Sequence, residues 1–243
     1  MTIWSWPSDS PPRVRTFRLR AFNISAVASQ SQEYIPGGVL VQKFEAGLTM
    51  PPMESDQWRD LDGLVVALRG AEGKIRLWDV QRKEPYYNST VAGSLATWDG
   101  GALWSGGEAW TAGKLPPFVV VGETASRGAD NILLKGFPPS LSGVLRRGDL
   151  FEMRPNGIPA DHGHLYEVTR WANSNSDGHA RVYFESGLRK GLRTGDMCVI
   201  GGAGIYPSSV FRLASDAEGE MEVNEAGHGS LGLRFTEVLP IAA

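Results

Sequence analysis

At 243 residues, the chain is long enough for one large domain or two small ones, and its hydrophobic and charged fractions (42% and 21%) are ordinary for a globular protein. A net charge of −3 excludes a strongly basic protein that neutralises a phosphate backbone, so we expect no specific nucleic-acid partner. The single cysteine, Cys198, excludes an intramolecular disulfide, and no apolar run reaches the ~18 residues of a membrane span. The first residues lack the pattern of a secretory signal, which predicts synthesis in the cytoplasm.

Turn-forming residues punctuate the whole chain, which contains 30 glycines and 15 prolines. Short apolar runs between frequent turns are typical of a mainly β fold. Residues 1–12 are polar and proline-rich but include Trp4 and Trp6, so they predict an arm that docks on another surface. Residues 14–48 alternate with period two and predict strands. The arginines at 13, 15, 18 and 20, in and just before this stretch, indicate one solvated face or a subunit contact.

One amphipathic helix is predicted at about 55–69, because apolar side chains recur there at steps of three and four. Gly70 is expected to end this helix in a left-handed conformation, and Gly73 to turn the chain into an alternating strand at 74–79. Gly63 lowers helix propensity by about 1 kcal/mol relative to alanine and suggests close packing at that point. The residues expected to face the core are Trp58, Leu61, Leu64, Val65 and Leu68.

The second half of the chain predicts a separate small domain. Residues 86–115 form a glycine-rich and tryptophan-rich stretch, interpreted as a loop or short hairpin in which Trp98, Trp104 and Trp110 are semi-buried. A proline pair at 116–117 marks a boundary, and six short strand-like runs follow, a number that suits a small β-barrel (OB-like) or a sandwich.

Metal-binding residue types come together only around His162 and His164, an H-x-H pair that Glu152, Glu167 or His179 could complete. The pair follows a turn-rich segment, so a plain loop is favoured over a metal site.

Catalytic and cofactor motifs are weak throughout. Asp149 and Asp196 lie in two similar Gly-Asp turns, where a carboxylate more often satisfies backbone amides than catalyses a reaction. The glycines at 201–204 lack the helix that a dinucleotide loop needs, and Cys198 has no nucleophile motif around it. We therefore expect no cofactor and no enzymatic activity.

The segment 50–79 contains an ordered set of motif elements, which are Trp58-Arg59, Leu61, Leu64, the run Ala67-Leu68-Arg69-Gly70, then Gly73 and Ile75-Arg76-Leu77-Trp78-Asp79. This segment resembles the phage distal tail protein family, including relatives in phage-derived particles. The later runs at 143–149, 164–168, 178–182, 211–213 and 235–239 occur in the same order in that family, so the resemblance covers most of the chain.

This resemblance implies a mainly β subunit of a hexameric ring in the tail tip (baseplate) of the virion. The subunit would contact other copies of itself, the tail tube protein, the tail-tip hub protein and the tape-measure protein in the channel. It also implies an N-terminal hub domain at 1–116, a β-sandwich or split barrel with one helix. A peripheral domain would span 117–205, and residues 206–243 would return to the hub. In a ring, Trp4, Trp6 and the Trp98–Trp104–Trp110 loop would anchor interfaces.

Two alternatives remain open from the sequence. The first is a carbohydrate- or receptor-binding β-sandwich that uses the glycine-flanked tryptophans as stacking platforms. The second is a metal-dependent small β-barrel enzyme built on His162 and His164.

Overall fold

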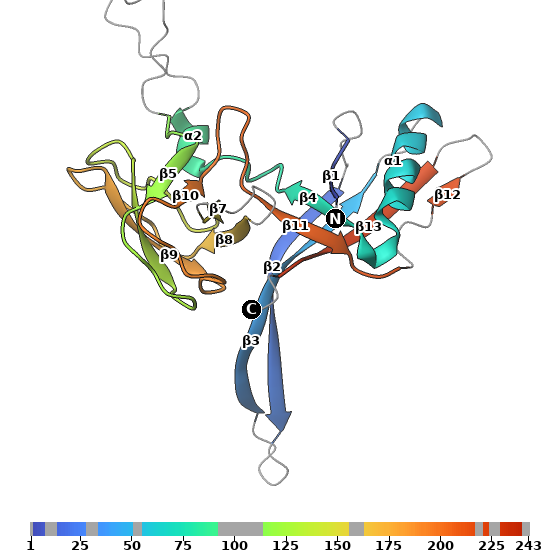
Figure 1. Ribbon diagram of the computed structural model, residues 1–243, viewed down its shortest axis with the longest axis horizontal. Helices are drawn as coiled ribbons and strands as arrows, with labels where there is room; N and C mark the ends of the chain where they lie inside the picture. Colours follow the sequence, from blue (N-terminus) through green and yellow to red (C-terminus); the bar gives the residue numbers. More distant parts are fainter. Residues whose placement is uncertain are drawn as a thin grey trace, which may run out of the picture. The chain divides into compact units, whose positions relative to one another are not determined.

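The computed structural model describes residues 2–7, 14–27, 34–50, 55–91, 114–155, 163–216, 221–223 and 229–239. The chain divides into two compact units, Met1–Leu77 with Ser209–Ala243, and Trp78–Ser208 (Figure 1). Both units are built mainly of β-strands, as the sequence predicts. None of the helices in the described ranges is long and apolar enough to cross a membrane.

The first unit contains one mixed β-sheet with the strand order β1-β4-β11-β13-β3-β2. β1 runs parallel to β4, whereas the pairs β11–β13, β13–β3 and β3–β2 are antiparallel. A short strand, β12, pairs with β13 outside this path. The strands are β1 (Ile3–Ser5), β2 (Val14–Val27), β3 (Tyr34–Thr49), β4 (Lys74–Trp78), β11 (Ser208–Leu213), β12 (Met221–Val223) and β13 (Gly229–Glu237).

Helix α1 (Ser55–Leu68) accompanies this sheet, and its buried positions follow the predicted spacing. Leu61, Leu64 and Leu68 are buried, Val65 is half-buried, and the side chain of Trp58 lies outside the described residues. The left-handed conformation begins at Arg69, one residue before the predicted Gly70, and a 3-10 turn, η1 (Gly70–Glu72), follows. The expected close packing at Gly63 is wrong within the described part of the chain, because Gly63 is exposed and a Cβ there would meet nothing within 4 Å.

Gly73 allows the chain to pass close to the end of α1. Its backbone N–H donates to the Leu68 carbonyl at 2.7 Å, and a Cβ at Gly73 would lie only 2.2 Å from that oxygen. We therefore expect Gly73→Ala to lower the free energy of unfolding by about 1–3 kcal/mol through overpacking. The matched control, Gly63→Ala, should raise it by up to about 1 kcal/mol because alanine favours the helix. Chemical denaturation of both variants measures the difference, and equal effects would contradict this role for Gly73.

The β2–β3 hairpin extends well beyond the rest of the sheet. β13 pairs with β3 only at residues 45–49, whereas β2 and β3 continue to pair with each other as far as Val27 and Tyr34. Residues 34–44 of β3 thus have only β2 as a described partner. At about 3.3 Å per residue, this two-stranded arm is about 30 Å long. Figure 1 shows the arm as the paired blue strands beyond β13.

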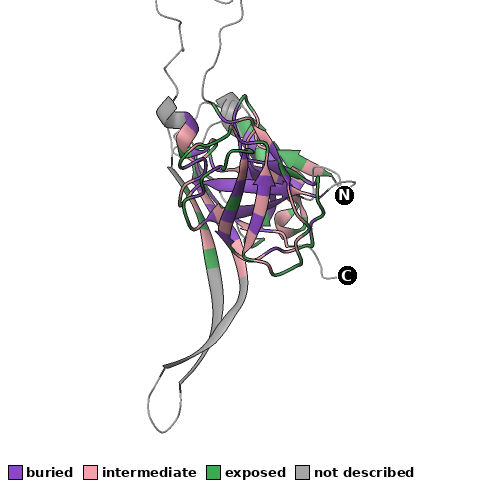
Figure 2. Ribbon diagram, turned by 90° about the vertical axis from the view of Figure 1, so that its left-hand side faces the viewer, coloured by how far each residue is buried: buried purple, intermediate pink, exposed green. Residues whose placement is uncertain are grey.

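The second unit is a closed barrel of six strands in the order β10-β5-β6-β9-β8-β7. Along β9, buried and more exposed residues alternate, as a closed barrel with a filled interior requires (Figure 2). The aromatic rings of Phe151, Tyr166 and Phe184 lie 5.1–5.5 Å apart in the core. The strands are β5 (Phe118–Val121), β6 (Asn131–Lys135), β7 (Leu150–Arg154), β8 (His164–Val168), β9 (His179–Glu185) and β10 (Met197–Val199).

The barrel consists of two similar halves, β5–β7 and β8–β10, with equivalent turns 47 residues apart in the sequence. The Asp149 carboxylate accepts a hydrogen bond from the backbone N–H of Arg146 at 2.7 Å, and Asp196 accepts one from Arg193 at 2.8 Å. The flanking backbone hydrogen bonds repeat with the same offset, from Gly148 N to Val168 O at 2.9 Å and from Gly195 N to Val121 O at 2.8 Å. Both aspartates therefore shape turns, as the sequence predicts.

The boundary predicted at 116 differs from the observed division, which assigns the chain from Trp78 onwards to the barrel unit. Arg82 binds this segment to the barrel through the Gly148 carbonyl at 3.2 Å and the Glu167 carboxylate at 3.3 Å. A second, short helix that the sequence did not predict, α2 (Tyr86–Val91), lies in the same segment. β11 and β13 lie in the sheet of the first unit, and the observed division assigns Ser209–Ala243 to that unit, whereas the sequence predicts this segment at 206–243.

Candidate interaction sites

An arginine held by two aromatic rings lies on the barrel unit. The guanidinium carbon of Arg146 is 4.5 Å from the ring centroid of Tyr86 and 4.8 Å from that of Trp171. One carboxylate positions two of these residues, because Asp149 accepts hydrogen bonds from the backbone N–H groups of Arg146 (2.7 Å) and Tyr86 (3.0 Å). We call Tyr86, Arg146 and Trp171 the arginine cluster.

The arginine cluster has two exposed rings, and its cation forms no ion pair within the described part of the chain. The exposed fractions are 51% for Tyr86 and 63% for Trp171. The Nε of Arg146 is buried without a hydrogen-bond acceptor, and the guanidinium forms no ion pair with any residue that the structure describes. Tryptophan, tyrosine and arginine are the residue types that contribute most to binding at protein interfaces. The cluster therefore has the composition of an interface site.

Asp149 supports the cluster through both oxygens of its carboxylate. Burial raises the pKa of its carboxyl group, although the hydrogen bonds from Arg146 and Tyr86 act in the opposite direction. Its two oxygens each accept one of these backbone hydrogen bonds. The other predicted acid, Asp196, belongs to the equivalent turn of the other half of the barrel, so the two carboxylates occupy separate turns.

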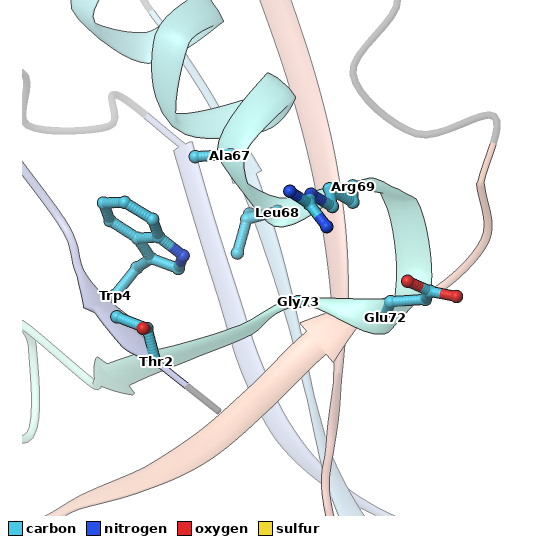
Figure 3. A pocket seen from close by; sticks show the side chains of 7 residues that line it. All are labelled: Thr2, Trp4, Ala67, Leu68, Arg69, Glu72 and Gly73. Carbon is cyan, nitrogen blue, oxygen red and sulfur yellow. The ribbon is translucent and has the colours of Figure 1, made fainter.

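A pocket of about 290 Å³ lies in the first unit, between β1 and the end of α1 (Figure 3). Trp4 is 40% exposed and, in Figure 3, its indole ring faces the last turn of α1. β1 is also the edge strand of the sheet in the described order, so the exposed indole of Trp4 lies on an edge strand. The lining residues are Thr2, Trp4, Ala67, Leu68, Arg69, Glu72 and Gly73.

The other predicted tryptophans are placed differently. Trp6 is half-buried, and its ring makes an edge contact of 6.4 Å with Phe235 of the same unit. Trp98, Trp104 and Trp110 lie outside the described residues, so their predicted role remains a prediction.

The predicted metal ligands have other structural roles where the structure describes them. His162 lies outside the described residues, and His164 is buried on β8. Glu152 binds Arg154 at 2.6 Å and accepts hydrogen bonds from Ser208. Across the described ranges, no three histidine, cysteine or acidic residues are grouped so that they could hold a metal ion.

Cys198 lies fully buried in the barrel core, and burial raises the pKa of its thiol well above the ordinary value. A buried, protonated thiol reacts slowly because the thiolate is the nucleophile. We expect a thiol-specific disulfide reagent to modify the native protein at least ~100-fold more slowly than the protein in concentrated guanidinium chloride, since the barrel must first open. Because the chain has one cysteine, a single absorbance trace measures this ratio. Rapid modification of the native protein would contradict the burial of Cys198.

Sequence analysis missed the arginine cluster. The only signal was the repeated Gly-Asp turn, which places Arg146 and Arg193 at equivalent positions. The ring contacts distinguish these two arginines, and they depend on Tyr86 from a distant segment of the chain.

Comparison with known proteins adds no identification, because no protein-family model matches the chain and no curated protein shows a significant match.

Proposed function

We propose that the chain is a structural subunit of a phage-type tail tip, which forms a hexameric ring around a channel and has no enzymatic role. The proposal rests on the order of the motifs that resemble the distal tail protein family. In that setting, the ring joins the tail tube protein to the tail-tip hub protein, with the tape-measure protein in the channel, and the protein resides in the virion.

The observation that carries the proposal is the two-stranded arm of β2 and β3. Along residues 34–44 of β3, β2 is the strand that pairs with β3 in the described sheet, because the pairing with β13 is confined to residues 45–49. β2 is the last strand of that sheet. Unpaired strand edges favour pairing with another chain. β1 ends the same sheet at its opposite edge, so the subunit offers two different edges. Contacts between different surfaces of identical subunits generate rings when the rotation closes.

Shortening the arm tests this proposal. Arg20 lies opposite Lys43, so replacing residues 21–42 with Asn-Gly should close a tight hairpin and retain the ring contact between Phe17 and Phe44. We expect the wild-type protein to form rings and the shortened variant to remain monomeric, with a similar melting temperature. Size-exclusion chromatography with light scattering, followed by negative-stain electron microscopy, measures both properties.

The matched control shortens only the tip. Val27 lies opposite Tyr34, so replacing residues 28–33 with Asn-Gly keeps both strands of the arm at full length. This control should still form rings. Rings of unchanged stoichiometry from the variant that lacks residues 21–42 would show that the arm is not the assembly element.

A further inference from the structure

We propose that the arginine cluster of one copy binds the outer face of α1 in the neighbouring copy, where Arg146 meets Asp62 and Trp171 lies over Gly63 beside Val66. This inference rests on the proposed ring and specifies one of its contacts. It follows from three properties of the described residues, which are the arginine held between two exposed rings, the exposed face of α1 and the net negative charge of the unit that contains this helix.

The arginine cluster is preorganised to receive a carboxylate. Tyr86 and Trp171 contact the guanidinium of Arg146 at 4.5 and 4.8 Å. The guanidinium forms no ion pair with a described acid, although its charge acts on the buried carboxyl of Asp149 and lowers the pKa of that group. Two further arginines of the same unit are exposed, Arg147, which follows Arg146 in the sequence, and Arg170, which precedes Trp171. A guanidinium fork fixed by its neighbours loses little side-chain freedom when it binds a carboxylate with two parallel hydrogen bonds.

The outer face of α1 has complementary features. Asp62 and Val66 are one helical turn apart, both are exposed, and Val66 is 67% exposed. Asp62 forms no ion pair with any residue in the described ranges. Gly63 leaves open space beside them, since a Cβ there would meet nothing within 4 Å. The face thus combines a free carboxylate, a shallow gap and an apolar side chain.

Gly63 is consistent with an intermolecular contact, because no contact within the described structure requires a glycine at this position. A glycine within a helix costs about as much stability as a lost hydrogen bond, and here neither a neighbouring backbone nor a positive φ requires it. A flat indole approaching the helix from another chain would occupy the gap that a larger side chain would fill.

The unit that contains α1 carries the net negative charge of the chain. Residues 78–208 contain 13 acidic and 13 basic side chains, so the barrel unit is neutral as a whole and the net charge of −3 resides in the other unit. A neutral barrel that presents Arg146 on its surface is not repelled by an acidic partner, and the local pairing of Arg146 with Asp62 would set the register of the contact. The barrel of one copy and the helix of the next are different surfaces, so their contact is heterologous and propagates around a ring.

Charge reversal tests the contact in the full-length protein. Arg146→Asp and Asp62→Arg should each weaken assembly at least ~30-fold, as expected for loss of a central interface pair. The chain carrying both substitutions should assemble close to wild-type level, because the pair is restored with its charges exchanged. Mass photometry over a dilution series measures the assembly midpoint. The matched control is Arg193→Asp, which changes the equivalent turn by the same charge and should leave assembly unchanged.

A second variant separates the contact from folding. Gly63→Gln should raise the melting temperature, because glutamine favours the helix, and should weaken assembly by at least ~10-fold by filling the gap under Trp171. Trp171→Ala should weaken assembly to a similar extent without a large change in melting temperature, since most of its side chain is exposed.

The outcomes distinguish this inference from the proposed function. Rings that are unaffected by Arg146→Asp, Trp171→Ala and Gly63→Gln would overturn the contact and leave the ring intact. Loss of assembly in both charge variants without rescue in the double variant would overturn the pairing with Asp62. A wild-type protein that is monomeric at every concentration would overturn both the contact and the ring.

Discussion

Phe151→Ala is expected to lower the free energy of unfolding of the barrel unit by about 3–5 kcal/mol, the cost of removing a large aromatic ring from a packed core. Phe151 is fully buried, and its ring lies 5.5 Å from that of Tyr166 and 5.4 Å from that of Phe184. Alanine would remove both ring contacts and leave a cavity at the centre of the closed barrel. Denaturant unfolding followed by far-ultraviolet circular dichroism measures the loss.

The control for this prediction is Val120→Ala on β5, whose side chain is 42% exposed. We expect a change of no more than about 1 kcal/mol, because the valine covers little of the core. If Phe151→Ala were as mild as Val120→Ala, the aromatic residues would not form the core that stabilises the barrel.

Glu237→Ala is expected to destabilise the first unit by about 2–4 kcal/mol, because it leaves two buried donors without an acceptor. The Glu237 side chain is buried, and its carboxylate accepts hydrogen bonds from the Phe44 backbone N–H at 3.0 Å and the Ser209 hydroxyl at 2.7 Å. Phe44 is the first residue of β3 beyond the stretch that pairs with β13. Glu237 therefore satisfies the backbone at the base of the β2–β3 arm.

Glu237→Gln provides the graded control, since an amide retains only one of the two carboxylate oxygens. It should cost less than the alanine variant, about 1–2 kcal/mol by denaturant unfolding. If the two variants were equally stable, the carboxylate would not be the group that holds β3 and β11 to β13.

Much of the fold follows from local patterns in the sequence. The short apolar or alternating runs of the second half identify all six barrel strands. Burial alternates along β6 and β9, whereas β7 and β8 are buried along most of their length. The spacing of Leu61, Leu64 and Leu68 identifies the buried face of α1, because residues three and four positions apart lie on the same face of a helix.

The features that sequence analysis missed depend on contacts between distant residues. Tyr86 joins the barrel through Asp149, which lies 63 residues away, so no local pattern assigns residues 78–91 to that unit. Gly63 shows how composition misleads, because a glycine in a helix suggests close packing and the structure instead shows open space. The length of the arm could not be predicted either. Alternation in residues 14–48 predicts strands, but the arm begins where β13 stops pairing with β3, and that point depends on a distant part of the chain.

The most direct test of the ring is the mass and shape of the purified full-length protein at micromolar concentration and above. The account predicts a species of six chains of 26.4 kDa and a ring with an open centre by negative-stain electron microscopy. A single 26.4 kDa species throughout the concentration range, with no ring in any image, would contradict the account.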